Sequence, residues 1–303
     1  FATYEDFFNA FRTQYEFIIK HDYIQQFTAD EVKKNVLAAP LASYYVGACR
    51  DAGTDIHQYV PNSIRENFLD KVGYATAIDS IAAVKKLVYE DKVISMSDLV
   101  DAIDADYEGY EALQQLLLHA PKYGNNDLYA DNVGREMDQI GFDYITAHHG
   151  THGEILCDRV VPVTIHIPAG MVVGATPDGR KAGQYLSEGT SASHGVELAG
   201  PTAVLMSNRN VKHEGYKERA ARLLNIKFSP ASMAVEEGMK KLVSFIRTWC
   251  DLKLWHVQFN VVNKETLIAA QKAPEQYKDL IVRVAGYSAY FTDLSPMLQT
   301  ELI

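Results

Sequence analysis

The segment 174–181 is a glycine-rich loop with basic residues, a pattern that can bind phosphate. It reads Gly-Ala-Thr-Pro-Asp-Gly-Arg-Lys. A phosphate-binding loop requires Lys directly after its second Gly and then Ser or Thr, to contact the phosphates and a metal ion. Here Arg180 stands at the Lys position and is followed by Lys181 and Ala182. Gly183 also disfavours the helix whose N-terminus would bind the phosphate, so the segment favours a Pro-Asp-Gly turn.

Three histidines, His148, His149 and His152, could hold a metal ion or contact a substrate. His148 and His152 have the i,i+4 spacing of a helical zinc-binding pair. Gly150 and Gly153 weaken a helix at this point. The residue after His148 is also not the carboxylate that a zinc hydrolase uses as its base. The pattern therefore favours a polar loop with exposed histidines, with a substrate-facing histidine as the alternative.

The cysteines are three in number and far apart in the sequence: Cys49, Cys157 and Cys250. An odd number at such spacing argues against a disulfide framework and fits a reducing cytoplasm. None of them has a nearby His in a nucleophile pattern. The default interpretation is a buried structural thiol.

Gly286 lies in the apolar segment Ile281-Val-Arg-Val-Ala-Gly286-Tyr-Ser-Ala-Tyr290. A glycine at the end of a strand ordinarily marks a turn or a bulge, because it tolerates a positive φ. Taken alone, this glycine would indicate no chemistry. The residues that flank it decide whether it has a further role.

The first half of the sequence is predicted to be helical. Thr3 and Asp6 have the spacing of a helix N-cap and its partner three residues later. Apolar residues then follow at helical spacing through Ile18. Segment 54–71 shows no period and is predicted to be a loop. Further helices are predicted over residues 40–50, 78–88, 95–103 and 110–118.

The composition changes near Arg159, after which β-branched segments alternate with helices. Strands are predicted over residues 160–167, 171–173, 254–262 and 281–284. Residues 176–200 form a polar, glycine-containing stretch that is predicted to be an ordered loop. Helices are predicted over residues 236–249 and 264–271, and from an N-cap at Ser295 onward. Helices followed by βα alternation indicate an α/β protein.

The composition excludes several classes of protein. The chain has 303 residues, 47% of them apolar and 22% charged, which excludes wholesale disorder. A formal net charge of -10 argues against a nucleic-acid-binding surface. No apolar run reaches the length of about 20 residues that a membrane-spanning helix needs. We therefore expect a cytoplasmic protein with neither a nucleic acid nor a membrane as its partner.

The segment Arg283-Val-Ala-Gly286-Tyr-Ser-Ala-Tyr-Phe resembles the radical-site signature of the glycyl radical enzymes. The preceding segment Trp255-His-Val-Gln-Phe-Asn-Val-Val-Asn263 resembles the strand that comes before that site in this family. Further similar blocks, in the family's order, are residues 79–86, 120–125, 176–180 and 200–203. The similarity is clear from residue 79 to residue 303 and looser before it.

The resemblance implies an α/β fold that is part of a ten-stranded α/β barrel, built of two half-barrels and wrapped by helices. Residues 1–158 would form a mainly helical outer layer of this barrel. Residues 159–303 would form the C-terminal βα part, with the glycyl radical loop at about 281–291. Thr164 and His166 alternate along the predicted strand at 160–167 and would share one face of it. Contact with substrate and a place in the core or on the surface both remain open for this pair.

The resemblance also implies that Gly286 is the catalytic residue that stores an organic radical. A backbone Cα radical is stabilised by delocalisation into the amide nitrogen on one side and the carbonyl on the other. This requires local planarity, with which a side chain would clash. The family resemblance implies a radical S-adenosylmethionine activating enzyme as partner, which carries an iron–sulfur cluster and removes the Gly286 hydrogen. The radical must be shielded from oxygen and water, so we expect an anaerobic enzyme. The resemblance implies no metal bound to this chain.

The sequence departs from the family at one point. Glycyl radical enzymes pass the radical to a cysteine on a second loop, which in most members reads roughly Gly-Cys-Val-Glu. None of Cys49, Cys157 and Cys250 has this neighbourhood. Because the thiyl loop lies upstream of the radical glycine in the family, we expect this chain to be the C-terminal part of a longer enzyme. The N-terminal remainder would then be its partner, and this chain alone is predicted to be inactive.

Two segments suggest a branch of the family. Residues 187–195 and 246–256 look most like the arylacetate decarboxylases, typified by the large subunit of 4-hydroxyphenylacetate decarboxylase. This predicts a lyase that decarboxylates an arylacetate such as 4-hydroxyphenylacetate, with a small iron–sulfur subunit as a further partner. The alternatives are a glycyl radical eliminase (diol dehydratase, choline lyase or sulfonate lyase), an arylsuccinate-type synthase, a non-catalytic radical-bearing partner segment and a plain metabolite-binding domain. We also expect a homo-oligomer.

Overall fold

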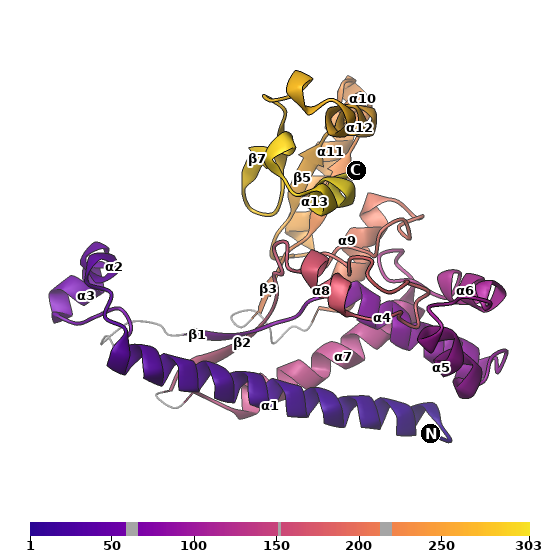
Figure 1. The fold of residues 1–303 in the computed structure, drawn as a ribbon, viewed down its shortest axis with the longest axis horizontal. Helices are drawn as coiled ribbons and strands as arrows, with labels where there is room; N and C mark the ends of the chain where they lie inside the picture. The colour runs from indigo at the N-terminus through magenta and orange to yellow at the C-terminus, as the bar shows by residue number, and fades with distance from the viewer. Residues whose placement is uncertain (59–65, 151–152, 213–219) are drawn as a thin grey trace. The chain divides into compact units, whose positions relative to one another are not determined.

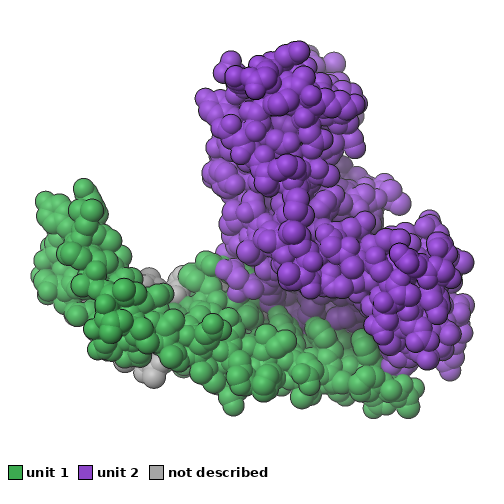
Figure 2. Space-filling view, viewed as in Figure 1, with its two compact units in different colours: residues 1–69, 139–159, 215–220 green, residues 70–138, 160–214, 221–303 purple. Residues whose placement is uncertain are grey.

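The computed structural model describes residues 1–58, 66–150, 153–212 and 220–303. These residues form a mixed α/β protein that divides into two compact units. Unit 1 consists of residues 1–69, 139–159 and 215–220, and unit 2 of residues 70–138, 160–214 and 221–303 (Figure 2). Within the described part of the chain, no helix is long and apolar enough to cross a membrane.

Unit 1 is built around the long helix α1 (Tyr4–Val36). The predicted capping box is confirmed: Thr3 Oγ1 accepts from the Asp6 backbone N–H at 3.1 Å, and the Asp6 carboxylate accepts from the Thr3 N–H at 3.2 Å. On the buried face of α1, the Tyr23 hydroxyl donates to the Cys157 carbonyl at 3.0 Å. The other elements of unit 1 are α2 (Pro40–Tyr45), α3 (Gly47–Ala52), β1 (Glu66–Asp70), β2 (Ile155–Val160) and the C-terminal end of α7 (Leu128–Ala147).

Unit 2 contains most of the short helices and the C-terminal strands (Figure 1). Its N-terminal helices are α4 (Tyr74–Ala83), which continues as the π-helix η1 (Val84–Glu90), α5 (Met96–Asp104), α6 (Glu111–Leu118) and the start of α7. They are followed by α8 (His166–Val172), α9 (Pro201–Asn210), β3 (Ala220–Arg222), β4 (Asn225–Phe228), α10 (Pro230–Met233) and α11 (Glu236–Asp251). The last elements are β5 (Gln258–Val261), α12 (Lys264–Lys272), η3 (Pro274–Gln276), β6 (Ile281–Arg283), β7 (Ser288–Tyr290), η4 (Phe291–Asp293) and α13 (Pro296–Leu302).

The strands form three short sheets. The first has the order β1-β2-β3, β4 pairs with β5 in parallel, and β6 pairs with β7 as an antiparallel hairpin. Among the described residues no sheet closes into a barrel. The predicted division into an outer layer of residues 1–158 and a βα part of residues 159–303 concerns the barrel as a whole and stays a prediction.

Several predicted elements are wrong or shifted. The strand predicted at 160–167 is wrong: β2 ends at Val160, because Pro162 cannot donate a backbone hydrogen bond within a sheet. His166 and residues 171–173 belong to or directly follow helix α8, so Thr164 and His166 do not share a strand face. The loop predicted at 54–71 contains strand β1, and the helix predicted at 40–50 is interrupted by Val46, whose backbone is extended.

Strand β6 and helices α12 and α13 lie where the sequence predicts them and form the core that carries the hairpin, whereas β5 is shorter than the strand predicted at 254–262. Ser295 caps α13 by accepting from the Leu298 N–H at 3.4 Å. Val282, Val284 and Ala285 of the hairpin are buried in a cluster with Phe291 and with apolar residues of α12 and α13. Burial of these side chains fixes the hairpin against two helices, since apolar burial is the main force that holds such elements together.

The segment 174–181 forms a turn that Arg180 closes from within. The Gly179 N–H donates to the Thr176 carbonyl at 3.0 Å, and Gly179 has a φ of 96°. The buried Arg180 guanidinium donates to the Thr176 hydroxyl at 3.1 Å and to backbone carbonyls. Those carbonyls belong to Val173, Gly174, Lys181 and Gln184. The hydrogen bonds of Arg180 are thus made to the loop itself, which agrees with the prediction of a turn and not a phosphate-binding loop.

Arg180→Lys should destabilise the protein, because one ammonium cannot satisfy carbonyls that the planar guanidinium contacts on two sides. We expect a loss of about 2 kcal/mol in the free energy of unfolding, measured as a lower urea midpoint. Lys181→Arg, at the neighbouring basic residue, is the matched control and should leave the midpoint unchanged. Equal midpoints for Arg180→Lys and the unmutated protein would contradict this role.

Candidate functional site

Gly286 lies in the loop of the β6–β7 hairpin. The strands pair Ile281 with Tyr290 and Arg283 with Ser288, and the Val284 N–H closes the loop by donating to the Tyr287 carbonyl at 2.9 Å. Gly286 has a φ of 77°, in the left-handed region that favours glycine. A Cβ built on Gly286 would meet no atom within 4 Å. The backbone conformation, and not crowding within this chain, is therefore what calls for glycine here.

Both peptide groups of Gly286 are held by side chains. Its N–H donates to Gln258 Oε1 at 2.8 Å, and its carbonyl accepts from Arg283 Nη2 at 3.0 Å. Arg283 Nε also donates to Gln258 Oε1 at 3.2 Å, which links the two side chains. The glycine is exposed in this chain, whereas Val284 and Ala285 before it are buried. The loop is therefore anchored on one side and accessible on the other.

Gln258 reaches the loop from the first residue of strand β5. The parallel register of β4 and β5 places Gln258 beside Asn225, and the Gln258 N–H donates to the Leu224 carbonyl at 2.8 Å. Its side chain is buried, and its Nε2 donates to the Val284 carbonyl at 3.1 Å. Because a carbonyl can only accept, this contact orients Oε1 toward the Gly286 N–H.

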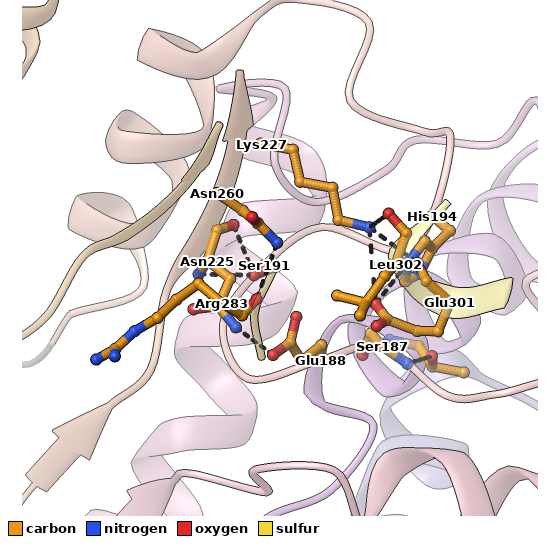
Figure 3. A network of polar contacts seen from close by, with 11 residues as sticks. Ser187, Glu188, Ser191, His194, Asn225, Lys227, Asn260, Arg283, Glu301 and Leu302 are labelled. Atoms are coloured by element: carbon orange, nitrogen blue, oxygen red, sulfur yellow. Dashed lines mark hydrogen bonds and ion pairs between the residues drawn. The ribbon is translucent and has the colours of Figure 1, made fainter. Parts of the chain in front are cut away.

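A polar network supports the first residue of β4 (Figure 3). Asn225 donates from its side-chain amide to the Glu188 carboxyl, and its backbone N–H donates to Ser191 Oγ at 3.2 Å. Ser191 Oγ in turn donates to the Asn225 carbonyl at 3.1 Å. These contacts tie the 176–200 loop to β4 and hence, through the sheet register, to the strand that carries Gln258.

A second group of charged residues joins the same loop to the C-terminal helix (Figure 3). His194 Nε2 contacts Glu301 Oε1 at 3.0 Å, and Lys227 Nζ donates to the Glu301 carbonyl at 2.8 Å. Burial opposes ionisation of Glu301, but the hydrogen bond from His194 and the charge of Lys227 outweigh it and lower the pKa of this carboxyl. Glu301 is therefore a buried anion that contacts the Lys227 ammonium and the His194 ring.

Two buried groups in this region favour their neutral forms. Burial, reinforced by the charge of Glu301, raises the pKa of Glu188 to about 8. Burial lowers the pKa of His166 to about 4. Neither ring nitrogen of His166 has a hydrogen-bond partner in the part of the chain that the structure describes. Both groups stay uncharged because a buried charge is costly where it lacks compensation.

Among the residues that the structure describes, the other sequence candidates do not form a site. His148 and His149 are exposed, and His152 lies outside the described residues. Over residues 1–58, 66–150, 153–212 and 220–303, no group of three His, Cys, Asp or Glu residues could hold a metal ion. Cys49 and Cys157 are buried thiols, but Cys250 is exposed on α11, contrary to the default interpretation.

The sequence matches two family profiles. Residues 1–170 match the profile described as pyruvate formate lyase-like, and residues 186–292, which include the hairpin loop, match the profile described as glycine radical. The chain belongs to the glycyl radical enzyme family. It therefore carries the domain that bears this family's radical cofactor.

The chain is similar over its whole length to much longer relatives. It is 50% identical over 307 residues to an isethionate sulfite-lyase from Nitratidesulfovibrio vulgaris, and it spans 37% of that protein. The solved structure of the glycerol-bound, B12-independent glycerol dehydratase from Clostridium butyricum superposes with a TM-score of 0.92 at 35% identity, over 100% of this chain and 38% of that one. These neighbours have the family's barrel fold, which confirms the predicted fold class.

The predicted arylacetate decarboxylase branch is wrong. An indoleacetate decarboxylase from Tractidigestivibacter scatoligenes is 34% identical over 76% of this chain, compared with 50% over the whole chain for the sulfite-lyase. The residues that suggested the branch explain the error. Glu188, Ser191 and His194 bind Asn225 and Glu301, so these residues hold the framework of the loop and do not distinguish one substrate branch from another. The prediction of a small iron–sulfur subunit depended on the decarboxylase branch and is therefore no longer supported.

Sequence reasoning missed the side chains that hold the glycine. Gln258 lay inside a segment already similar to the family, but nothing in its spacing indicated a contact with Gly286, which is 28 residues away. Arg283 belongs to the segment that resembles the radical-site signature, but its position there indicates no role of its own. The only available signal was a polar residue at the first position of the strand next to the hairpin.

Glu188→Gln should be more stable than the unmutated protein, by an amount that increases as the pH rises. The pKa of Glu188 is about 8 in the folded protein, whereas the ordinary pKa of a glutamate side chain is 4.5. The stability it contributes is therefore complete below pH 4.5 and is lost as the pH rises to 8. Glutamine stays neutral and can still accept from Asn225, so we expect a gain on the order of 3 kcal/mol at pH 7.

Thermal unfolding of both proteins at intervals from pH 4.5 to 8 measures this difference. The melting temperatures should nearly coincide at the acid end and diverge steadily above it. A difference that does not change with pH would show that Glu188 is ionised in the folded protein across this range.

Proposed function

We propose that Gly286 stores the radical of a glycyl radical enzyme. The observation that carries this proposal is the match of residues 186–292 to the glycine radical profile, together with the exposed, positive-φ loop at Gly286. Glycine has no Cβ to oppose planarity at Cα, so delocalisation over the two adjoining peptide groups is possible. The radical supplies hydrogen-atom abstraction, and the chain's residues position it.

Access to the loop supports a role for an activating enzyme. Gly286 and the two residues after it are exposed in this chain. A radical S-adenosylmethionine activating enzyme can therefore approach the Gly286 Cα from the side away from the buried Val284 and Ala285. Storage of the radical would then require the rest of the polypeptide to cover this side, because a carbon radical must be kept from oxygen and water.

The reaction supported best is radical elimination from a hydroxyalkanesulfonate such as isethionate. The support is the 50% identity to isethionate sulfite-lyases over the whole chain. Isethionate and glycerol share one arrangement, a leaving group on the carbon next to a hydroxyl-bearing carbon. Arylacetates lack it. Dehydration of a small diol or triol is the second candidate, favoured by the superposition on glycerol dehydratase.

The cysteine that abstracts hydrogen from substrate lies outside this chain in our proposal. Within this sequence, Cys49, Cys157 and Cys250 lack the neighbourhood of the family's thiyl loop. The chain spans about 37% of the curated relatives it matches. We therefore keep the prediction that residues 1–303 alone do not turn over substrate.

The test uses the full-length protein that contains this chain, activated without oxygen. We expect an electron paramagnetic resonance doublet and release of sulfite from isethionate. Gly286→Ala should abolish both, because alanine has a Cβ at the radical carbon. The open space beside Gly286 means that the variant should still fold, at a cost of about 1 kcal/mol for the positive φ.

Circular dichroism of Gly286→Ala is the control for folding. Glycerol and propane-1,2-diol are offered in parallel, and their dehydration without sulfite release would favour the second candidate. A doublet that persists in Gly286→Ala would place the radical elsewhere and contradict the proposal.

A further inference from the structure

The two hydrogen bonds to Gly286 act on opposite sides of its Cα. On the N-terminal side, Gln258 Oε1 accepts from the Gly286 N–H at 2.8 Å. On the C-terminal side, the Arg283 guanidinium donates to the Gly286 carbonyl at 3.0 Å. An electron-rich acceptor thus contacts the amide nitrogen, and a cation contacts the carbonyl.

We propose that Gln258 and Arg283 are positioning residues that stabilise the unpaired electron by polarising the peptide groups on both sides of it. This inference rests on the proposed storage of the radical on Gly286. A Cα radical between an amide nitrogen and a carbonyl gains stability when the nitrogen donates electron density and the carbonyl withdraws it. Acceptance of the N–H hydrogen bond by Gln258 makes the nitrogen a better donor. The charge-assisted bond from Arg283 makes the carbonyl a better acceptor.

The surrounding contacts fix this arrangement. Gln258 is buried, and its Nε2 donates to the Val284 carbonyl at 3.1 Å, so its oxygen must face the Gly286 N–H. Arg283 Nε donates to the same oxygen at 3.2 Å, and Arg283 Nη1 donates to Ser288 Oγ at 3.3 Å. Each side chain therefore has partners other than Gly286, which hold it in place before and after the hydrogen atom is removed.

Asn260 offers a matched control in the same strand. Its Nδ2 donates to the Arg283 carbonyl at 2.9 Å (Figure 3). This bond also ties β5 to the hairpin, but it does not touch the peptide groups of Gly286. A purely structural clamp would depend on Asn260 and Gln258 alike, whereas polarisation of the radical depends on Gln258 and Arg283 only.

The experiment compares the full-length protein with Gln258→Met, Arg283→Gln, Arg283→Lys and Asn260→Leu after anaerobic activation. A substitution can change the yield of radical simply by altering how the activating enzyme binds the loop. The readouts are therefore the α-proton splitting of the doublet and the rate of radical decay, which depend on the radical itself. With less delocalisation, spin density returns to Cα. We expect a larger splitting and a several-fold faster decay in Gln258→Met and Arg283→Gln, with Arg283→Lys intermediate and Asn260→Leu unchanged.

A splitting and decay rate that stay at the unmutated values in both Gln258→Met and Arg283→Gln would overturn this inference and leave the assignment of Gly286 intact. The assignment itself fails separately, if the doublet survives in Gly286→Ala. Since Arg283 is exposed and Gln258 is buried, Arg283→Gln carries the test if Gln258→Met does not fold.

Discussion

The site depends on one constraint: Gly286 has no side chain, so other residues must hold its backbone in place. Side-chain packing cannot position a glycine, so its neighbours do so. Val284 and Ala285 are buried beneath it, and Gln258 and Arg283 bind its two peptide groups. A left-handed φ at this point turns the chain back into β7 and leaves the Cα on the accessible side of the loop.

The rest of unit 2 supports this arrangement through two connected layers. The core cluster of the hairpin with α12 and α13 fixes β6 and β7 by apolar burial. The polar layer runs from Glu301 through Lys227 to β4, and from Glu188 through Asn225 to the same strand. Since β4 pairs with β5 in register and Gln258 Nε2 donates to the Val284 carbonyl, both layers meet at Gln258. Neutral Glu188 and ionised Glu301 keep this layer free of an uncompensated buried charge.

Sequence reasoning succeeds here where the information is local. The capping box at Thr3, the N-cap at Ser295 and the strand that ends in a turn at Gly286 each depend on residues within a few positions of one another. It fails where the information is distant. The strand predicted at 160–167 is mostly turn and helix, and the contact between Glu188 and Asn225 joins residues 37 positions apart. The substrate branch was misjudged for the same reason, because conspicuous polar residues of the loop bind other parts of the framework.

Mass spectrometry of protein labelled with α-deuterated glycine tests the central claim, that Gly286 carries the unpaired electron, most directly. Residues 284–303 contain Gly286 as their only glycine, and trypsin cleaves after Arg283. After anaerobic activation, quenching with a thiol should return hydrogen to the radical carbon, and the peptide that begins at Val284 should lose one deuterium. Full retention of deuterium at Gly286, in a sample whose resonance spectrum shows a radical, would contradict the account.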